Sequence, residues 1–384
     1  MTFITPPRGY RKEDTKKRIR WIEDKTGFRL NQREPNEPED LKGIIENHTG
    51  FISIPMGVAG PLLIDGTYAK GDYYIPLCTL EGTLVMSMTR GLFLTHLCGG
   101  IKTRHLKQEL SRSPIFIFDE IDATPHFLHW VDENIAPIRK AAESTTQHGK
   151  LLRIDKYPTQ NSVILDFVYY TGEAAGQNMV TLATHEACKY IKETYRQFNG
   201  FRYLIESNFN ADKNPATKTV LIGRGHQVLA SALIRAKPLR RILRTTAKEY
   251  VDGWTHCTHG AHMAGVIGMN MHVANALTAI YLATGQDAAC VAENAVGVTS
   301  YEVRNGEDLY VTVTMPSISV GTVGGGTRLK QQRANLEMLG CTGPDSSKKL
   351  AEIISAAALA LEISLGGAVA SDEFAQSHAT YGRK

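Results

Sequence analysis

The stretch AGVIGMNMHVANALTAIYLATGQDAA, residues 264–289, sets a condition that the rest of the chain must meet. After two glycines it holds no Asp, Glu, Lys or Arg until Asp287, and apolar residues recur at helical spacing over Met271–Ala283. Because the opposite face is also small or apolar, we predict a helix buried on all sides, ending at Gly285. A buried carboxylate costs several kcal/mol or more unless it is paired, so the chain must supply Asp287 with a cation.

The composition is that of an ordinary globular protein. The 384 residues allow about two or three domains, and a net charge of +4 gives no argument for nucleic-acid binding. We find no apolar run of the roughly 20 residues that span a bilayer, and no apolar signal segment at the N-terminus. Six scattered cysteines without a CxxC pair are typical of reduced thiols. We therefore expect a cytoplasmic protein that binds neither nucleic acid nor membrane.

Three regions can be distinguished along the chain. Residues 1–45 are polar and predict an N-terminal helical cap or arm. Residues 106–206 alternate in the order β-α-β-β-α-β, the split βαβ arrangement of ferredoxin-like domains. Residues 46–105 and 207–384 remain for a large domain, with a helix over 78–97. The predicted fold class is α+β: a large helical and β domain around a central buried helix, with an inserted ferredoxin-like domain.

Four residues could carry acid–base or electrostatic chemistry: Glu81, Lys213, Asp287 and His378. Glu81 is expected in the first turn of the helix over 78–97, and Lys213 lies in a polar loop at a domain junction. His378 lies six residues before the end, where a histidine can close over a site. Each also has an ordinary structural explanation, since loop lysines and terminal histidines are commonly just solvated.

Two glycine-containing segments could approach a phosphate. GEAAGQNM (172–179) opens a predicted helix, whose free N–H groups suit a pyrophosphate, and PSISVGTVGGGTRL (316–329) concentrates glycines after a strand. Neither matches the GxGxxG pattern of Rossmann folds, so a nucleotide would bind by another route. HCTHGAH (256–262) suggests zinc, but its histidines are spaced unevenly around a helix without an orienting acid. We therefore predict no metal site.

Taken in order, several of these motifs resemble one enzyme family from about residue 45 to the end of the chain. ENHTGFISIPMGVAGPL, TLEGTLVMSMTRG, GEAAGQNM, ADKNPA, NMHVANALTAIYLATGQDAA, PSISVGTVGGGT and SHATYGR resemble the signature stretches of 3-hydroxy-3-methylglutaryl-CoA (HMG-CoA) reductase. GVAGPL and the spacing resemble class I, found in eukaryotes and archaea, in a form without the membrane anchor of the animal enzymes. The resemblance implies a four-electron, NAD(P)H-dependent reduction of HMG-CoA to mevalonate and coenzyme A, in a homodimer or higher homo-oligomer whose subunits share an active site.

The resemblance also implies the roles of the four candidate residues. Lys213 would be the cation beside Asp287 and would stabilise the oxyanion that forms when hydride attacks the thioester carbonyl. His378 would protonate the departing coenzyme A thiolate. Glu81 would act as general acid in the second reduction, with a pKa raised by burial against Asp287.

Binding roles follow from the same resemblance. The implied substrate-binding residues are Asn275 and Ser207 near the acyl group, Arg104 at its carboxylate, Arg90 near the coenzyme A phosphates and Ser87 beside His378. The implied cofactor-binding residues are Thr146, Gln147, Glu173, Gly176, Asn178, Gly324 and Gly325, for NADPH or NADH. No metal is implied.

Several positions depart from the family pattern. Asn214 stands where the family often has a second lysine that helps to hold the substrate carboxylate, and Gln147 lies where an arginine usually contacts the 2′-phosphate of NADP. Lys150 and His148 could substitute for that arginine. These departures leave open a paralogous reductase that uses the same four residues on another acyl-CoA or carrier-bound thioester. A non-catalytic homologue is disfavoured because none of the four residues is lost.

Overall fold

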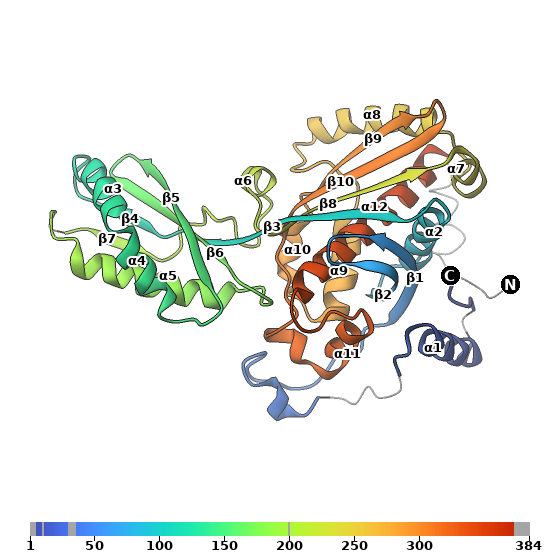
Figure 1. Ribbon diagram of the computed structural model, residues 1–384, viewed down its shortest axis with the longest axis horizontal. Coiled ribbons are helices and arrows are strands. Elements are labelled where there is room, and N and C mark those ends of the chain that lie inside the picture. Colours follow the sequence, from blue (N-terminus) through green and yellow to red (C-terminus); the bar gives the residue numbers. More distant parts are fainter. Residues whose placement is uncertain (1–4, 10, 30–35, 199, 372–384) are drawn as a thin grey trace.

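The computed structural model describes residues 5–9, 11–29, 36–198 and 200–371. They form a large body and a smaller one, which are joined by strand β3 (Ile101–Arg112) (Figure 1). Two separate hydrophobic clusters underlie this division, one drawn from residues 59–101 and 228–363, the other from residues 110–195. The second cluster falls inside the predicted insertion at 106–206, and we keep those limits as the proposed domain bounds.

One sheet runs through both bodies. Its strand order is β7 (Arg202–Leu204), β4 (Ile115–Ile117), β6 (Ser162–Tyr170), β3, β8 (Gly225–Ile234), β10 (Asp308–Ile318) and β9 (Val298–Arg304). Strand β3 belongs to both bodies, because residues 102–109 pair with β8 and residues 110–112 pair with β6. The hairpin of β1 (Met56–Asp65) and β2 (Lys70–Cys78) adjoins the start of β3. The far end of β3 therefore carries Arg112 to the junction between the bodies.

The small body follows the predicted β-α-β-β-α-β order, except that its first helix is divided. That helix forms α3 (Ala123–Glu133) and α4 (Ile135–Glu143), which meet at Asn134. Strand β5 (Lys150–Thr159) pairs with β6, and helix α5 (Gln177–Thr194) leads to β7. The resulting strand order β7-β4-β6-β5 is antiparallel throughout.

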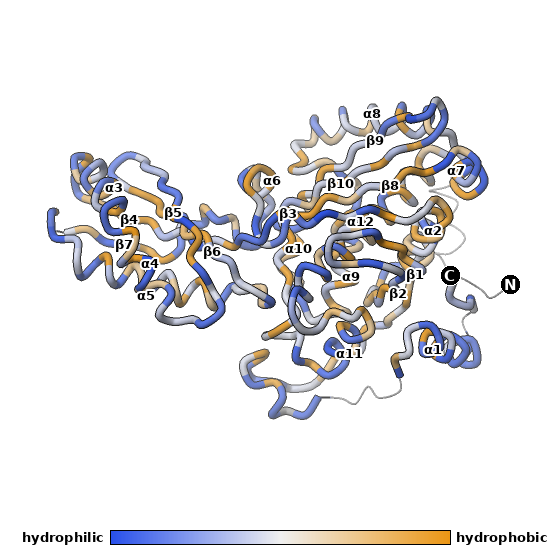
Figure 2. The backbone as a smooth tube through the Cα atoms, viewed as in Figure 1, coloured by the Kyte–Doolittle hydropathy of each residue, from blue (hydrophilic) through white to orange (hydrophobic). Residues whose placement is uncertain are grey.

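The core of the large body contains two apolar helices where we predicted one. The predicted central helix is α9 (Val273–Thr284), which starts two residues later than expected and is largely buried. Helix α12 (Ser346–Ala370) is long and apolar enough to span a membrane, so our statement that no such run exists was wrong. However, 78% of its most apolar window is buried inside the protein, where it contacts α9 and the sheet (Figure 2). It is therefore a core helix of this fold.

Two buried carboxylates connect α12 to the segments around it. Glu352 accepts hydrogen bonds from the backbone N–H groups of residues 67–69 and of His105. Glu362 accepts hydrogen bonds from the N–H groups of residues 271 and 272 and contacts the His272 ring nitrogen Nδ1 at 2.8 Å. These donors replace the water that each carboxylate loses on burial. Glu362 thereby fixes the segment that leads into α9.

The other elements surround this core. They are α1 (Lys12–Thr26), η2 (Pro38–Leu41), α2 (Leu84–Leu97), α6 (Thr217–Leu221), α7 (Ala236–Leu243), α8 (Ala247–Met263), η3 (Ala288–Cys290), α10 (Val291–Asn294), η4 (Gly325–Arg328) and α11 (Lys330–Met338). Helix α1 belongs to the predicted N-terminal arm and reaches the large body through an edge contact of Trp21 with Tyr74. Helix α2 starts later than predicted because Thr83, just before it, has a left-handed backbone conformation. Glu81 therefore lies in the turn ahead of the helix and not in its first turn.

Candidate active site

The predicted pairing of Lys213 with Asp287 is present. The Lys213 Nζ lies 3.2 Å from the Asp287 Oδ2. Our reason for expecting the pair was wrong, however, because the Asp287 side chain is 46% exposed. It lies beyond the left-handed Gly285 that ends α9, where it accepts a hydrogen bond from the N–H group of Ala289 at the start of η3. The pair is therefore accessible to a ligand.

The backbone of Lys213 is fixed by a buried ion pair. Lys213 has a left-handed φ of +60°, and its N–H group donates to the Glu293 Oε2 at 2.7 Å. Glu293 is fully buried, and its Oε1 accepts hydrogen bonds from the Arg224 Nη1 at 2.9 Å and from the Ser319 hydroxyl at 2.7 Å. The sequence analysis did not predict this role of Glu293, because the pairing depends on contacts between distant segments.

Asp287 raises the pKa of the Lys213 amine above its ordinary value, mainly through their hydrogen bond. The ammonium form therefore persists to a pH above the usual range of a lysine, and its loss sets an alkaline limit on any step that needs the charge. In the Asp287→Asn variant this support is removed, and the pKa of Lys213 falls. We expect the alkaline limb of kcat/KM for thioester reduction to move to lower pH, measured between about pH 7 and 11.

Asp252→Asn, on the exposed face of α8, is the matched control and should leave the limb in place. An unchanged limb in Asp287→Asn would show that Lys213 is not the group whose deprotonation is observed.

Glu81 lies at the other end of α9. Its Oε1 accepts a hydrogen bond from the Asn275 amide at 3.3 Å, near the start of the helix, whereas Asp287 follows the helix end. Helix α9 has 12 residues, so it is about 18 Å long. Within one chain Glu81 is exposed and lies far from Asp287, so the expected burial of Glu81 against Asp287 would need the Glu81 of a second subunit.

A cavity of about 390 Å³ surrounds Glu81 and Asn275. It is lined by Ile54, Cys78, Thr79, Leu80, Glu81, Leu84, Asn275, Thr278, Ala279 and Leu282. Two further predicted residues, Ser87 and Arg90, follow on α2. Both reach Ser364 of α12, at 3.0 Å from the Ser87 hydroxyl and 2.9 Å from the Arg90 Nε. His378 lies outside the described residues.

Ser207 was assigned to the acyl group of the substrate and Arg104 to its carboxylate. Ser207 lies near Lys213 in the chain, in the loop between β7 and α6. The Ser207 hydroxyl donates to the Ser113 carbonyl at 2.6 Å. Arg104 lies on β3, where its Nη1 donates to the Asp65 carbonyl at 2.8 Å. Arg104 precedes Arg112 by eight positions along β3, roughly 26 Å, so within one chain Arg104 lies far from the junction end of the strand.

The proposed nucleotide residues gather at the start of α5. Gly176 is the N-cap of this helix, and Asn178 lies exposed in its first turn. The Thr146 hydroxyl contacts the Met179 sulfur at 3.2 Å, which places Thr146 and the exposed Gln147 beside the same helix start. The first backbone N–H groups of α5 and the exposed loop that contains Gln147 therefore lie on the same side of this helix.

The glycine-rich segment approaches the same region through a bridge between Val323 and Ala174. Gly324 and Gly325, next along the chain, have positive φ and no neighbouring atoms within 4 Å of an added Cβ. Glu173, also predicted to bind the cofactor, makes contacts within the chain: its two oxygens accept the N–H groups of Asp345 and Ser347, both at 2.7 Å. Glu173 therefore holds the start of α12 and links the two bodies.

Comparison with known proteins identifies the family. A family model described as hydroxymethylglutaryl-coenzyme A reductase matches residues 14–383. The chain belongs to this family. It is 39% identical over 376 residues to the 3-hydroxy-3-methylglutaryl-coenzyme A reductase of Methanocaldococcus jannaschii, covering 96% of this chain and 93% of that protein. It is 42% identical over 345 residues to the enzyme of the same name from Aeropyrum pernix, covering 88% of this chain and 82% of that protein.

The fold of the chain is also that of a solved HMG-CoA reductase. A class II enzyme from Streptococcus pneumoniae, solved with NADPH in open conformations, superposes with a TM-score of 0.73 at 17% identity, over 92% of this chain and 96% of that one. At this identity the likeness concerns the fold. The predicted family membership, the α+β class and the oxidoreductase activity are thus confirmed.

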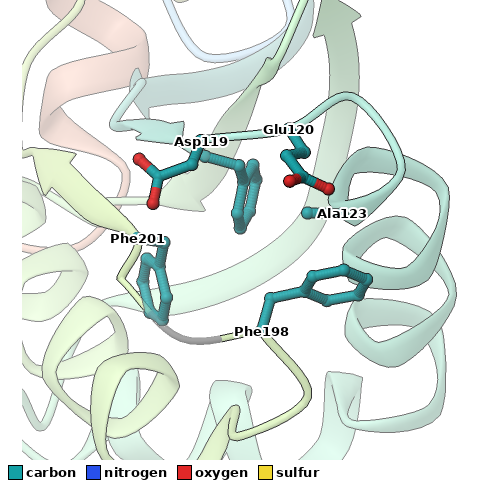
Figure 3. A pocket seen from close by; sticks show the side chains of 6 residues that line it. Asp119, Glu120, Ala123, Phe198 and Phe201 are labelled. Atoms are coloured by element: carbon teal, nitrogen blue, oxygen red, sulfur yellow. The ribbon is translucent and has the colours of Figure 1, made fainter.

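A second hollow in the chain lies apart from these residues. It has a volume of about 190 Å³ and is lined by Phe118, Asp119, Glu120, Ala123, Phe198 and Phe201 (Figure 3). Phe118 and Phe201 lie at the ends of β4 and β7 that face away from Ser113 and Ser207. This hollow is therefore not continuous with the site around Lys213 and Asp287. Among the described residues, the histidines of α8 do not form part of any group suited to a metal ion.

Proposed function

We propose that this HMG-CoA reductase family member carries out the four-electron reduction of HMG-CoA to mevalonate and coenzyme A. The observation that supports it is the accessible Lys213–Asp287 pair at the junction of the two bodies, in a chain that matches 93% of a relative bearing that enzyme's name. The ammonium of Lys213 donates to the thioester oxygen and stabilises the negative charge that develops there. Asp287 keeps that ammonium protonated and oriented.

Bound NADPH supplies the hydride for each of the two reductions. His378 is proposed as the acid that protonates the departing thiolate, and Glu81 as the acid that acts in the reduction of the aldehyde. Asn275, which donates to Glu81, keeps that carboxyl oriented towards the cavity. Each role assigns a proton to a named side chain, so each can be tested by substitution.

The start of α5 is the proposed site of the nicotinamide nucleotide. The first N–H groups of an 18-residue helix and its positive dipole end suit a pyrophosphate, and Gly176 leaves the approach open. Gln147 offers no charge for a 2′-phosphate, but Lys150, the first residue of β5, has a 60% exposed side chain whose Nζ lies 3.7 Å from the Glu143 Oε2. We infer NADPH as the preferred cofactor, with a weaker preference over NADH than an arginine would give.

A shared active site between two subunits is supported by the separation of the catalytic residues. Because Glu81 and Asp287 lie at opposite ends of α9, one chain alone does not bring Glu81 to Lys213. Exposed apolar side chains line the Glu81 cavity, with Leu80 84% exposed and Ile54 37% exposed. Covering them requires a second copy, which would place its own Glu81 near Lys213.

A second candidate is the reduction of a thioester whose acyl group has no carboxylate. Asn214 has no charge, and its amide donates to the Asp212 carbonyl at 2.9 Å and to the Asn208 Oδ1 at 3.2 Å. The position where the family often has a lysine is therefore occupied by a loop-stabilising amide.

The stoichiometry of the reaction tests the proposed function. With HMG-CoA and excess NADPH, we expect two NADPH oxidised for each coenzyme A thiol released, with mevalonate as the product, because the aldehyde is reduced in the same site. The measurement combines absorbance at the nicotinamide band with a thiol reagent and mass spectrometry. Turnover only with uncarboxylated acyl-CoA substrates would favour the second candidate, and no oxidation with any thioester would refute both.

The proposed compartment is the cytoplasm. The six cysteines form no disulfide with one another, and three of them are buried, which suits a reducing environment.

A further inference from the structure

A network of charged side chains, built on the buried Arg112, Arg224 and Glu293, lies beside Lys213 at the junction of the two bodies. The Arg112 side chain, 10% exposed at the end of β3, pairs with Glu206 through Nη1 and with Asp212 through Nη2 at 3.5 Å. Arg224 pairs with Asp212 at 3.4 Å and with Glu293 at 2.9 Å. Asp212 is the chain neighbour of Lys213, so the network extends up to the reacting lysine.

This network is already rich in negative charge. It contains three cations, Arg112, Arg224 and Lys213, and four carboxylates, Glu206, Asp212, Glu293 and Asp287, which leaves a formal charge of −1. Lys218, the next lysine along the chain, is paired with Asp166 at 2.5 Å and adds no net charge. An arriving carboxylate would therefore meet a negative site.

Glu206 occupies the position in which a ligand carboxylate could bind Arg112. A guanidinium offers donors that match a carboxylate, and the Arg112 Nη1 already donates to the Glu206 carboxylate. Its Oε1 accepts the Asn208 N–H at 2.7 Å, and its Oε2 accepts the Asn210 amide at 2.8 Å. The side chain is nevertheless 33% exposed, so it can be displaced towards solvent.

We propose that Glu206 determines the acyl specificity of the enzyme by competing with a substrate carboxylate for Arg112. A carboxylated acyl group binds Arg112 only when Glu206 moves away, whereas an uncarboxylated one meets no such competition. This inference rests on the proposed thioester reduction and deepens it, because it names the residue that sets the preference between carboxylated and uncarboxylated acyl groups.

Two thioesters that differ only in the carboxylate test this inference: HMG-CoA and 3-hydroxy-3-methylbutyryl-CoA. In Glu206→Gln we expect the ratio of kcat/KM for the first over the second to rise about tenfold, through a lower KM for HMG-CoA, because a like charge has been removed. Glu206→Asp keeps the charge and should keep the wild-type ratio. Glu302→Gln, on the exposed strand β9, is the control and should also keep it.

An unchanged or lower ratio in Glu206→Gln would overturn the inference, as would an equal rise in Glu206→Asp, which would indicate a steric effect. The dissociation constants of both thioesters, measured by calorimetry without NADPH, should show the same tenfold change in ratio. If neither thioester is reduced, the proposed function fails. The binding ratio then still decides the role of Glu206.

Discussion

Replacing Lys213 with methionine should lower kcat for the reduction of the thioester by about a thousandfold, the upper range for loss of one preorganised donor to an oxyanion. Methionine keeps a similar length but cannot donate a hydrogen bond or carry charge. Asp287 would then lie unpaired beside the developing negative charge, which adds to the loss. The measurement is NADPH oxidation at saturating thioester, with released thiol measured in parallel.

The matched control is Lys237→Met, an exposed lysine on α7, which should retain wild-type kcat. Because the Lys213 side chain is 47% exposed, its replacement should not lower the melting temperature enough to explain the loss. A Lys213→Met enzyme with kcat within tenfold of wild type would show that another donor contacts the oxyanion.

The residues that could be predicted from the sequence are those whose neighbours in the chain determine their surroundings. The apolar period of α9 and the glycine at its end located Asp287, and the junction of two domains located Lys213. The exposure of Asp287 could not be predicted in the same way, because it depends on where the chain turns after the helix. Our argument from a buried carboxylate therefore led to the right partner for a reason that the structure does not support.

Other roles depend on contacts between distant segments, which periodicity does not reveal. Glu173 binds the start of α12, 172 residues away, and so acts between the bodies although its motif pointed to the nucleotide. Glu206 and Arg112 are 94 residues apart and meet only because β3 crosses from one body to the other. The polar composition of a loop indicates that it faces water or a ligand, but only the folded chain shows which cation its carboxylate neutralises.

Mixing two inactive variants should restore activity if two subunits form each active site. We expect Glu81→Gln and Lys213→Met to be inactive alone as homodimers. In a heterodimer one site combines both substitutions. The other site takes its unchanged Glu81 from the Lys213→Met subunit and its unchanged Lys213 from the Glu81→Gln subunit. Random pairing of equal amounts gives one intact site in half of the dimers, so activity should reach about a quarter of wild type.

This expectation follows from the position of Glu81 and Asp287 at opposite ends of α9. The two variants carry different affinity tags, and their co-purification establishes that subunits have exchanged. Glu81→Gln mixed with Glu81→Gln bearing the other tag is the control and should remain inactive. If tagged heterodimers form but show no activity above the sum of the two variants, Glu81 and Lys213 act within one chain, and a large closure of that chain must bring them together.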